Sequence, residues 1–179
     1  MTRRIHAYVD PERFVAGTVG LPGERTFYLQ AQDGNAITSV SLEKSQVAML
    51  ADRIERLLTQ AGHSLASGSD DNEPLSLPLD EEFRVGALGI AWVPDEGSGD
   101  RIVIEAHMLG EVEAAEPGDD DPDAADTLRV SLSPAAAAAF ARRAEALVAA
   151  GRPPCPFCLQ PLDAGGHICP RANGFRRRD

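Results

Sequence analysis

Three cysteines and a histidine stand close together near the C-terminal end of the sequence. Residues 154–170 read PCPFCLQPLDAGGHICP and contain all three cysteines of the chain. A Cys-x-x-Cys turn brings two thiolates to one ion, and residues i and i+2 of an extended segment point to the same side. Three thiolates and one imidazole form a tetrahedral set that suits Zn²⁺. The spacing predicts one zinc ion held by Cys155, Cys158, His167 and Cys169.

Other cysteine chemistry fits this stretch less well. A thioredoxin-like redox pair follows a strand and opens a helix, whereas prolines flank and interrupt the pair at 155–158. A disulfide framework would leave one thiol over, and we expect no signal peptide at the N-terminus. Iron–sulfur ligation stays open as an alternative.

A zinc deaminase shares the P-C-x-x-C half of the motif but also requires an upstream His-x-Glu, whose carboxylate moves the proton. None of His6, His63 and His107 has a glutamate two positions on. Four protein ligands also leave no open position for water at the ion. We therefore expect a structural zinc, with no catalytic residue and no organic cofactor.

Composition restricts the class of protein. The chain has 179 residues, 43% of them apolar, and a formal net charge of −11. This length suits one domain with appendages, and the negative charge disfavours nucleic acid and anionic membrane surfaces as partners. No apolar run approaches the length of a membrane span. We expect a cytoplasmic protein.

Two charged segments allow more than one interpretation. The acidic run at 111–126 is interpreted as a solvated, mobile loop. Calcium binding is the alternative, but the run lacks the residue pattern of a calcium-binding loop. The tail at 171–179 carries four arginines. It is interpreted as a solvated terminus. The alternatives are contact with the acidic run, with an acidic partner, or with nucleic acid phosphates.

The sequence contains an internal repeat. Residues 14–20 (FVAGTVG) resemble residues 83–89 (FRVGALG), and in the same comparison Leu50 aligns with Phe140. Each copy is predicted to contain three strands followed by a helix, in repeats at about 12–62 and 82–150. We expect an α+β fold in which the two βββα repeats form a pseudo-two-fold, antiparallel-sheet domain over residues 1–150. A zinc-binding tail, 151–179, follows it.

Hydrophobic periodicity and capping residues place the elements within each copy. An amphipathic helix is predicted at 44–60 and an alanine-rich one at 135–150, with Ser133 as N-cap. The glycines at 17, 20, 86 and 89 lie in strand-like segments and predict bulges or close packing. Residues 64–80 are rich in Ser, Asp and Pro, so we expect a linker.

Two stretches resemble a known family. PCPFCLQPLDxxGHICPRxNGF at 154–175 and RFVAGTVGxPGxRTFYLQA at 13–31 are similar to motifs of an uncharacterised actinobacterial repeat-protein family, a domain of unknown function. The resemblance implies a cytoplasmic bacterial protein without an established activity. It also implies gene neighbours that are kinase-like and phosphatase-like, and so a protein partner of either kind.

The sequence favours a non-enzymatic zinc-binding adaptor or protein-interaction protein over an enzyme. A closed metal site and a separable terminal module support this hypothesis. The first alternative is an enzyme with a cleft between the repeats, where His6, His107 and nearby carboxylates would converge. The second is nucleic-acid binding through the zinc tail, with contacts from its arginines.

Overall fold

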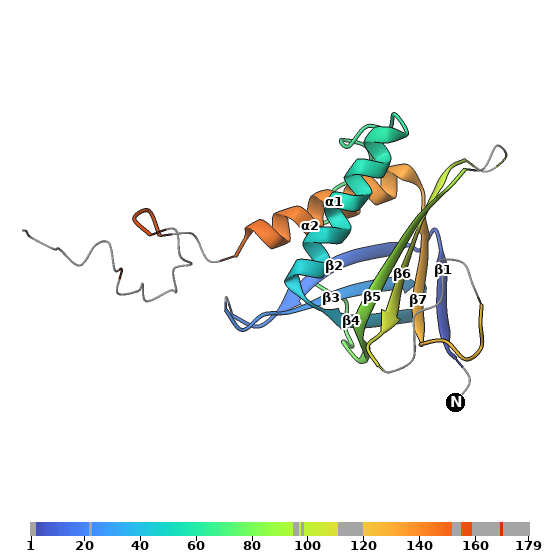
Figure 1. Ribbon diagram of the computed structural model, residues 1–179, viewed down its shortest axis with the longest axis horizontal. Helices are drawn as coiled ribbons and strands as arrows, with labels where there is room; N and C mark the ends of the chain where they lie inside the picture. Colours follow the sequence, from blue (N-terminus) through green and yellow to red (C-terminus); the bar gives the residue numbers. More distant parts are fainter. Residues whose placement is uncertain are drawn as a thin grey trace, which may run out of the picture.

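The described part of the chain contains seven strands and two helices (Figure 1). The computed structural model describes residues 3–21, 23–94, 97, 99–110, 120–151, 155–158 and 169. The elements are β1 (Ile5–Val9), β2 (Arg13–Val19), β3 (Thr26–Asp33), β4 (Ala36–Leu42), α1 (Lys44–Gln60), β5 (Glu81–Val93), β6 (Arg101–Met108), β7 (Thr127–Leu132) and α2 (Pro134–Ala149). Neither helix has the length and apolar character that a membrane crossing requires of a helix in the described residues.

The strands form one mixed sheet in the order β1-β7-β6-β5-β4-β3-β2. Strands β2 to β4 and strands β5 to β7 are antiparallel neighbours, but β4 pairs with β5 and β1 pairs with β7 in parallel. The prediction of an antiparallel sheet is wrong at these two pairs. The connection from β4 to β5 contains a helix, which is the kind of crossover that parallel strands need. Strand β1 precedes the predicted repeats and joins the sheet at β7.

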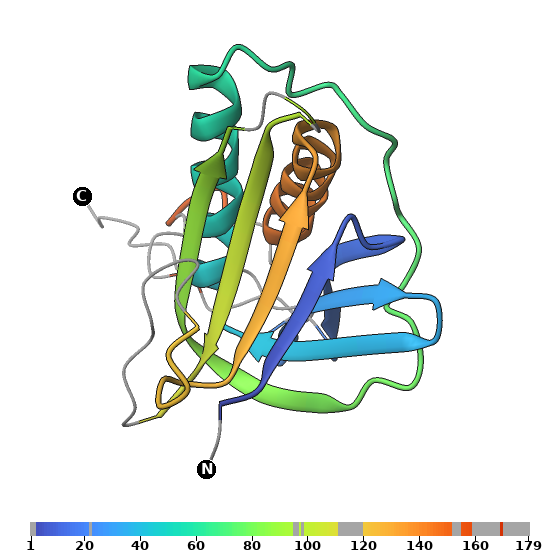
Figure 2. The same cartoon turned by 90° about the vertical axis from the view of Figure 1, so that its right-hand side faces the viewer.

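Both helices lie on one face of this twisted sheet (Figures 1 and 2). The predicted helices at 44–60 and 135–150 are confirmed, and their apolar stripes form the core. The rings of Phe14 on β2 and Phe140 on α2 stack with their centroids 4.7 Å apart. Helix α2 packs against β2, helix α1 packs against β5, and the two helices pack against each other. Each helix thus covers a strand that is distant from it in the sequence.

The predicted capping residues begin and end the helices. The Ser133 hydroxyl accepts a hydrogen bond from the backbone N–H of Ala136, and Pro134 occupies the first turn of α2. Helix α1 ends before Gly62, whose φ of 78° is the left-handed conformation that closes many helices. These local signals explain why the boundaries could be predicted from the sequence.

The segment 64–80 contains no helix or strand, yet it is fastened to the domain. Figure 2 shows it leaving α1, passing over α2 and following the edge of the sheet at β2. Arg143 of α2 donates hydrogen bonds to Asp71 and to the carbonyls of Ala16 and Glu73. Arg13 of β2 pairs with the same Asp71 carboxylate at 2.6 Å. The predicted linker is therefore a bound strap over β2 and α2, here called the 64–80 strap.

Two glycines allow side chains to approach the strands closely. A Cβ at Gly17 would lie 2.5 Å from the Leu75 side chain of the 64–80 strap. A Cβ at Gly86 would lie 2.8 Å from the Cα of Leu109, and the register of β5 shifts beside this glycine. Both observations confirm that these glycines mark close packing, with a bulge in β5.

The acidic run is only partly described, since residues 111–119 lie outside the described residues. In the described part, the Asp126 carboxylate accepts a hydrogen bond from the backbone N–H of Arg4. Asp120 pairs with Arg129 of β7 at 2.7 Å. Residues 120–126 are thus tied to β7 and to the residue that precedes β1, which differs from the expectation of a mobile loop.

Candidate metal centre

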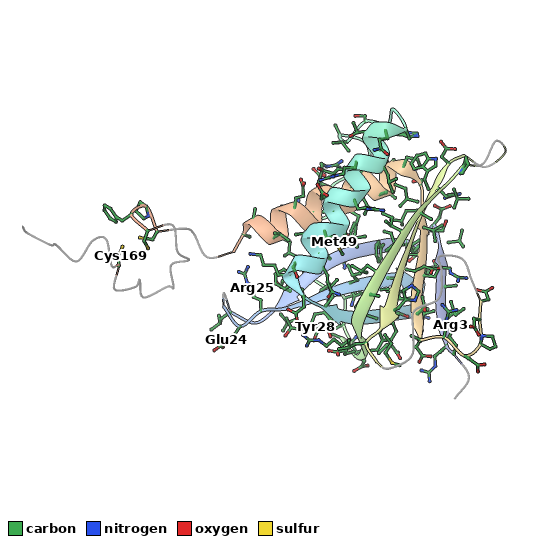
Figure 3. The ribbon with its side chains drawn as sticks, in the orientation of Figure 1. Arg3, Glu24, Arg25, Tyr28, Met49 and Cys169 are labelled. Carbon is green, nitrogen blue, oxygen red and sulfur yellow. The ribbon has the colours of Figure 1, made fainter. Side chains whose placement is uncertain are left out.

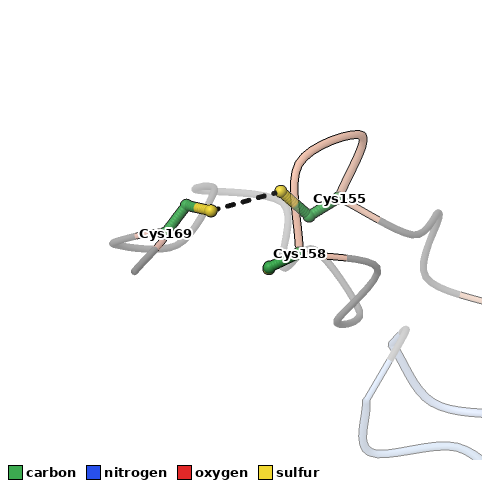
Figure 4. Close-up of side chains that lie close together, drawn as sticks. All are labelled: Cys155, Cys158 and Cys169. Atoms are coloured by element: carbon green, nitrogen blue, oxygen red, sulfur yellow. Dashed lines mark hydrogen bonds between the residues drawn. The ribbon is translucent and has the colours of Figure 1, made fainter. Parts of the chain in front are cut away.

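The structure brings the three predicted cysteine ligands together (Figure 4). The Sγ atoms of Cys155, Cys158 and Cys169 all lie within 4.8 Å of one another, and those of Cys155 and Cys169 are 3.8 Å apart. Cys155 and Cys158 are the two ends of a turn at 155–158, and Cys169 reaches them from beyond it. A set of thiols this close is what the Cys-x-x-Cys spacing predicts.

The sulfur separation agrees with shared coordination of one ion. A Zn–S bond is about 2.3 Å long, so two sulfurs of a tetrahedral site lie about 3.8 Å apart. The 3.8 Å between Cys155 and Cys169 matches this separation. A disulfide needs only about 2.05 Å between its sulfurs, and all three cysteines are thiols. The arrangement therefore suits metal ligands better than a disulfide.

Burial distinguishes the cysteines from the residues between them. Cys155 and Cys169 are 3% and 6% exposed, whereas Phe157 is 60% exposed. A thiolate is costly to bury without a compensating charge, and a metal cation supplies one. Cys155 and Cys169 are thus buried, Cys158 is half-buried, and the turn presents one aromatic ring to solvent.

The remaining predicted ligand, His167, lies outside the described residues. So does the arginine tail at 171–179. The structure accordingly supports a cluster of three cysteines that can bind a metal, while the histidine ligand stays a prediction.

The histidines proposed for an enzyme site do not meet. His6 on β1 is paired in register with Leu128 of β7, while His107 on β6 is paired with Thr127. Successive residues of a strand point to opposite faces of the sheet, so these histidines lie on opposite faces. The His6 ring contacts Thr38 at 3.4 Å. The structure provides no support for their convergence in a cleft between the repeats.

His107 instead belongs to a buried polar network. Its Nδ1 lies 3.0 Å from the Thr127 hydroxyl, and its Nε2 lies 3.5 Å from a Glu105 carboxylate oxygen. The Thr127 hydroxyl donates to the carbonyl of Ala125, so it accepts a hydrogen bond from His107 Nδ1. Burial lowers the pKa of His107, and the Glu105 carboxylate opposes that shift.

The contacts of this network indicate a structural role. Glu105 and Thr127 are 0% exposed and His107 is 2% exposed, so no substrate reaches them from solvent. The Thr127 proton is committed to a carbonyl, which leaves the histidine no proton to remove for a nucleophilic attack. Sequence reasoning missed the network. The sequence feature that could have revealed the network is the spacing of Glu105 and His107, which stand two positions apart on one strand. Their side chains therefore point to the face opposite to that of the core residues Ile104 and Ala106.

His63, which follows α1, lies near one acidic and one aromatic side chain. Its Nε2 is 3.7 Å from an Asp100 oxygen, and its ring centroid is 5.4 Å from that of Trp92. These contacts join the end of α1 to the β5–β6 turn.

The comparisons with known proteins add a family and no function. No curated protein and no solved structure matches the chain. A family model described as a protein of unknown function, DUF3090, matches residues 6–169. The matched range includes Cys155, Cys158, His167 and Cys169. Since it spans most of the chain, the chain belongs to the DUF3090 family of proteins of unknown function.

Proposed function

We propose that the chain is a non-enzymatic, zinc-binding protein that acts by binding another protein. The observation that carries the proposal is the approach of the three cysteine sulfurs to within 4.8 Å of one another. Thiolates favour Zn²⁺ among the common divalent ions. In this proposal His167 supplies the remaining ligand. Four protein ligands close the coordination sphere, so the zinc folds the segment and activates no water.

The exposed ring of Phe157 supports an interaction role. A segment of this length has too few apolar residues for its own core, so a bound metal would supply the folding free energy, about 10–16 kcal/mol in zinc-finger peptides. With the metal stabilising the turn, its aromatic side chain is not needed for a core and can face outward. Aromatic side chains are enriched at protein interfaces. The partner in this proposal is a protein, with kinase-like and phosphatase-like proteins as the first to test. A zinc-thiolate site suits the reducing cytoplasm of a bacterium.

The duplication is also part of the proposal. Strands β2 to β4 with α1, and strands β5 to β7 with α2, follow the same order. Leu50 and Phe140, which align between the copies, are both buried. The carboxyl groups of the aligned residues Glu55 and Glu145 lie close enough across the two helices for Glu145 to raise the pKa of Glu55, together with burial. Contact between equivalent residues is what a two-fold axis produces, and this supports a pseudo-two-fold axis between α1 and α2.

Metal analysis tests the zinc site. Untagged protein is expected to contain one zinc per chain, and Cys169→Ser and His167→Gln should each lower the zinc content or affinity. His63→Gln is the matched control, because His63 is a histidine outside the proposed ligand set, and it should keep the zinc of the wild type. Wild-type protein without metal, with three thiols that react freely, would refute the site.

Affinity capture from the native cytoplasm tests the interaction role. Full-length protein is compared with a truncation that ends at Gly151. At least one protein partner should be recovered only with the full chain. Recovery of the same partners with both proteins would contradict a binding role for the C-terminal segment.

A further inference from the structure

The 64–80 strap shows how this fold holds a segment that follows a helix. Arg142 of α2 donates to the carbonyl of Ser67 at 2.8 Å and pairs with Asp70 at 2.7 Å. The backbone at Gly68 lies so close to α2 that an added Cβ would be 2.3 Å from the carbonyl oxygen of Ala135. The segment after α1 is therefore bound along the surface of α2.

The proposed duplication predicts an equivalent site on α1. In the register that places Leu50 on Phe140, Leu65 corresponds to Cys155 and Gly68 corresponds to Cys158. The α2 residues that carry the strap have their own counterparts on α1, at Ser45, Met49, Asp52 and Arg53. If the two halves are built alike, this face of α1 holds the segment that contains the cysteines.

A groove lies at this place on α1. It has a volume of about 360 Å³ and is lined by Met49, Leu50, Arg53, Leu88, Gly89 and Ile90, so it runs between α1 and β5. The side of β5 that faces β4 pairs only through residues 81–84. Among the described residues, no strand continues that pairing beside Leu88 and Ile90. Met49 is 54% exposed there, although it is a large apolar side chain.

The chain leaves α2 close enough to reach the groove. A Cβ at Gly151 would lie 2.6 Å from the Lys44 ammonium nitrogen, so the end of α2 adjoins the start of α1. Met49 lies five residues further along α1, about 7.5 Å at 1.5 Å per residue. The four residues from Gly151 to Cys155 span up to about 13 Å. The length of the connection therefore permits contact.

We propose that the turn at 155–158 docks on the groove between α1 and β5 of its own chain, with Phe157 as the apolar side chain that enters it. The proposal rests on the proposed zinc site, because metal binding fixes the turn that presents Phe157. In the docked state the ring is covered, so the groove competes with the proposed partner protein for Phe157. Figure 3 shows Met49 and Cys169 apart, so docking is a rearrangement that we expect to accompany metal binding. The groove supplies the exposed apolar surface and the turn supplies a 60% exposed ring.

A cobalt-substituted sample tests docking and metal binding separately. Co²⁺ replaces zinc in cysteine sites, its thiolate complexes absorb visible light, and its paramagnetism perturbs nearby NMR signals. The full-length chain has three methionines, and ¹³C-methyl labelling gives a signal for Met49 in the groove and for Met108, which does not line it. On Co²⁺ addition the Met49 signal should shift or broaden more than that of Met108.

Two variants and one control assign the effect. Phe157→Ser and, in the groove, Leu88→Thr should each reduce the cobalt effect on Met49 while the absorption persists. Val9→Ser replaces another exposed apolar residue, far from the groove on β1, and should leave the effect unchanged. If the Phe157→Ser variant also fails to bind cobalt, the Leu88→Thr variant alone tests docking, because its change lies outside the metal-binding segment.

Three outcomes would overturn docking within one chain. The cobalt bands could form while Met49 and Met108 respond equally. The Met49 effect could survive both variants, or it could grow with protein concentration, which would indicate binding to a second copy. Absence of the cobalt bands would instead refute the metal site, and with it this proposal. The absorption and the NMR signals therefore identify which of the two proposals fails.

Discussion

Replacing Arg143 with alanine should release the 64–80 strap. The Arg143 side chain is only 14% exposed and donates to Ala16 O at 2.8 Å, Glu73 O at 2.7 Å and Asp71 Oδ1 at 2.9 Å. These bonds join α2, β2 and the strap at one point. The change removes all of them together.

The expected loss of folding stability follows from the number and kind of these hydrogen bonds. A hydrogen bond to a charged group contributes about 1.5–3 kcal/mol, but bonds that share one donor do not add, and water replaces some of them once the strap moves. Arg13 also continues to pair with Asp71 at 2.6 Å, so the Asp71 carboxylate keeps one cation beside it. We expect Arg143→Ala to lower the free energy of unfolding by about 2–4 kcal/mol.

Urea denaturation with a matched arginine variant measures this cost. Arg56 on α1 pairs with Asp52 at 3.0 Å, but its side chain is 71% exposed. Arg56→Ala should therefore change the free energy of unfolding by no more than about 0.5 kcal/mol. Amide exchange should accelerate at Ser76, whose N–H donates to Gln30 of β3. Equal costs for the two arginine variants would refute the strap as a stabilising element.

Two further changes test the helix pair and the close packing of the strap. The pKa of Glu55 is raised by burial and by the carboxyl group of Glu145, so this group favours the fold below its ordinary pKa of 4.5 and that contribution is lost as pH rises. Glu55→Gln should raise the free energy of unfolding by a few tenths of a kcal/mol at pH 7 and by less at pH 4; an equal gain at both pH values in urea denaturation would contradict the repulsion. Gly17→Ala should cost about 1–3 kcal/mol, because its Cβ would collide with Leu75. Leu75→Ala should recover part of that cost in thermal unfolding, and strictly additive losses would rule out the contact.

Local patterns in the sequence predicted the elements well, because their causes are local. The stripe along 44–60 and the serine cap at 133 each depend on residues within a few positions. The parallel pairing of β1 with β7 joins Ile5 to Thr127, and no periodicity within either strand specifies a neighbour so distant. The polar composition of 64–80 predicts a linker, but the same composition is typical of a bound strap, and only the arginines on distant elements decide between them.

The residues of the candidate site also differ in how far the sequence could predict their positions. Cys155 and Cys158 could be placed together from their spacing, because one turn determines it. The network of Glu105, His107 and Thr127 depends on the strand register and on burial in the folded domain. Strand register and burial both depend on residues that are distant in the sequence, so this network could be found only in the folded structure.

The parallel pairing of β1 has a consequence for synthesis on the ribosome. Val9 is translated 122 positions before its partner in β7, Ser131. At about 5–20 residues per second, β1 waits roughly 6–25 s for its neighbour. Strands β2 to β4 need only close neighbours and can pair in the meantime. We expect the nascent chain to expose β1 as an unpaired strand until β7 has been made, and a chaperone that binds extended segments would find it during that time.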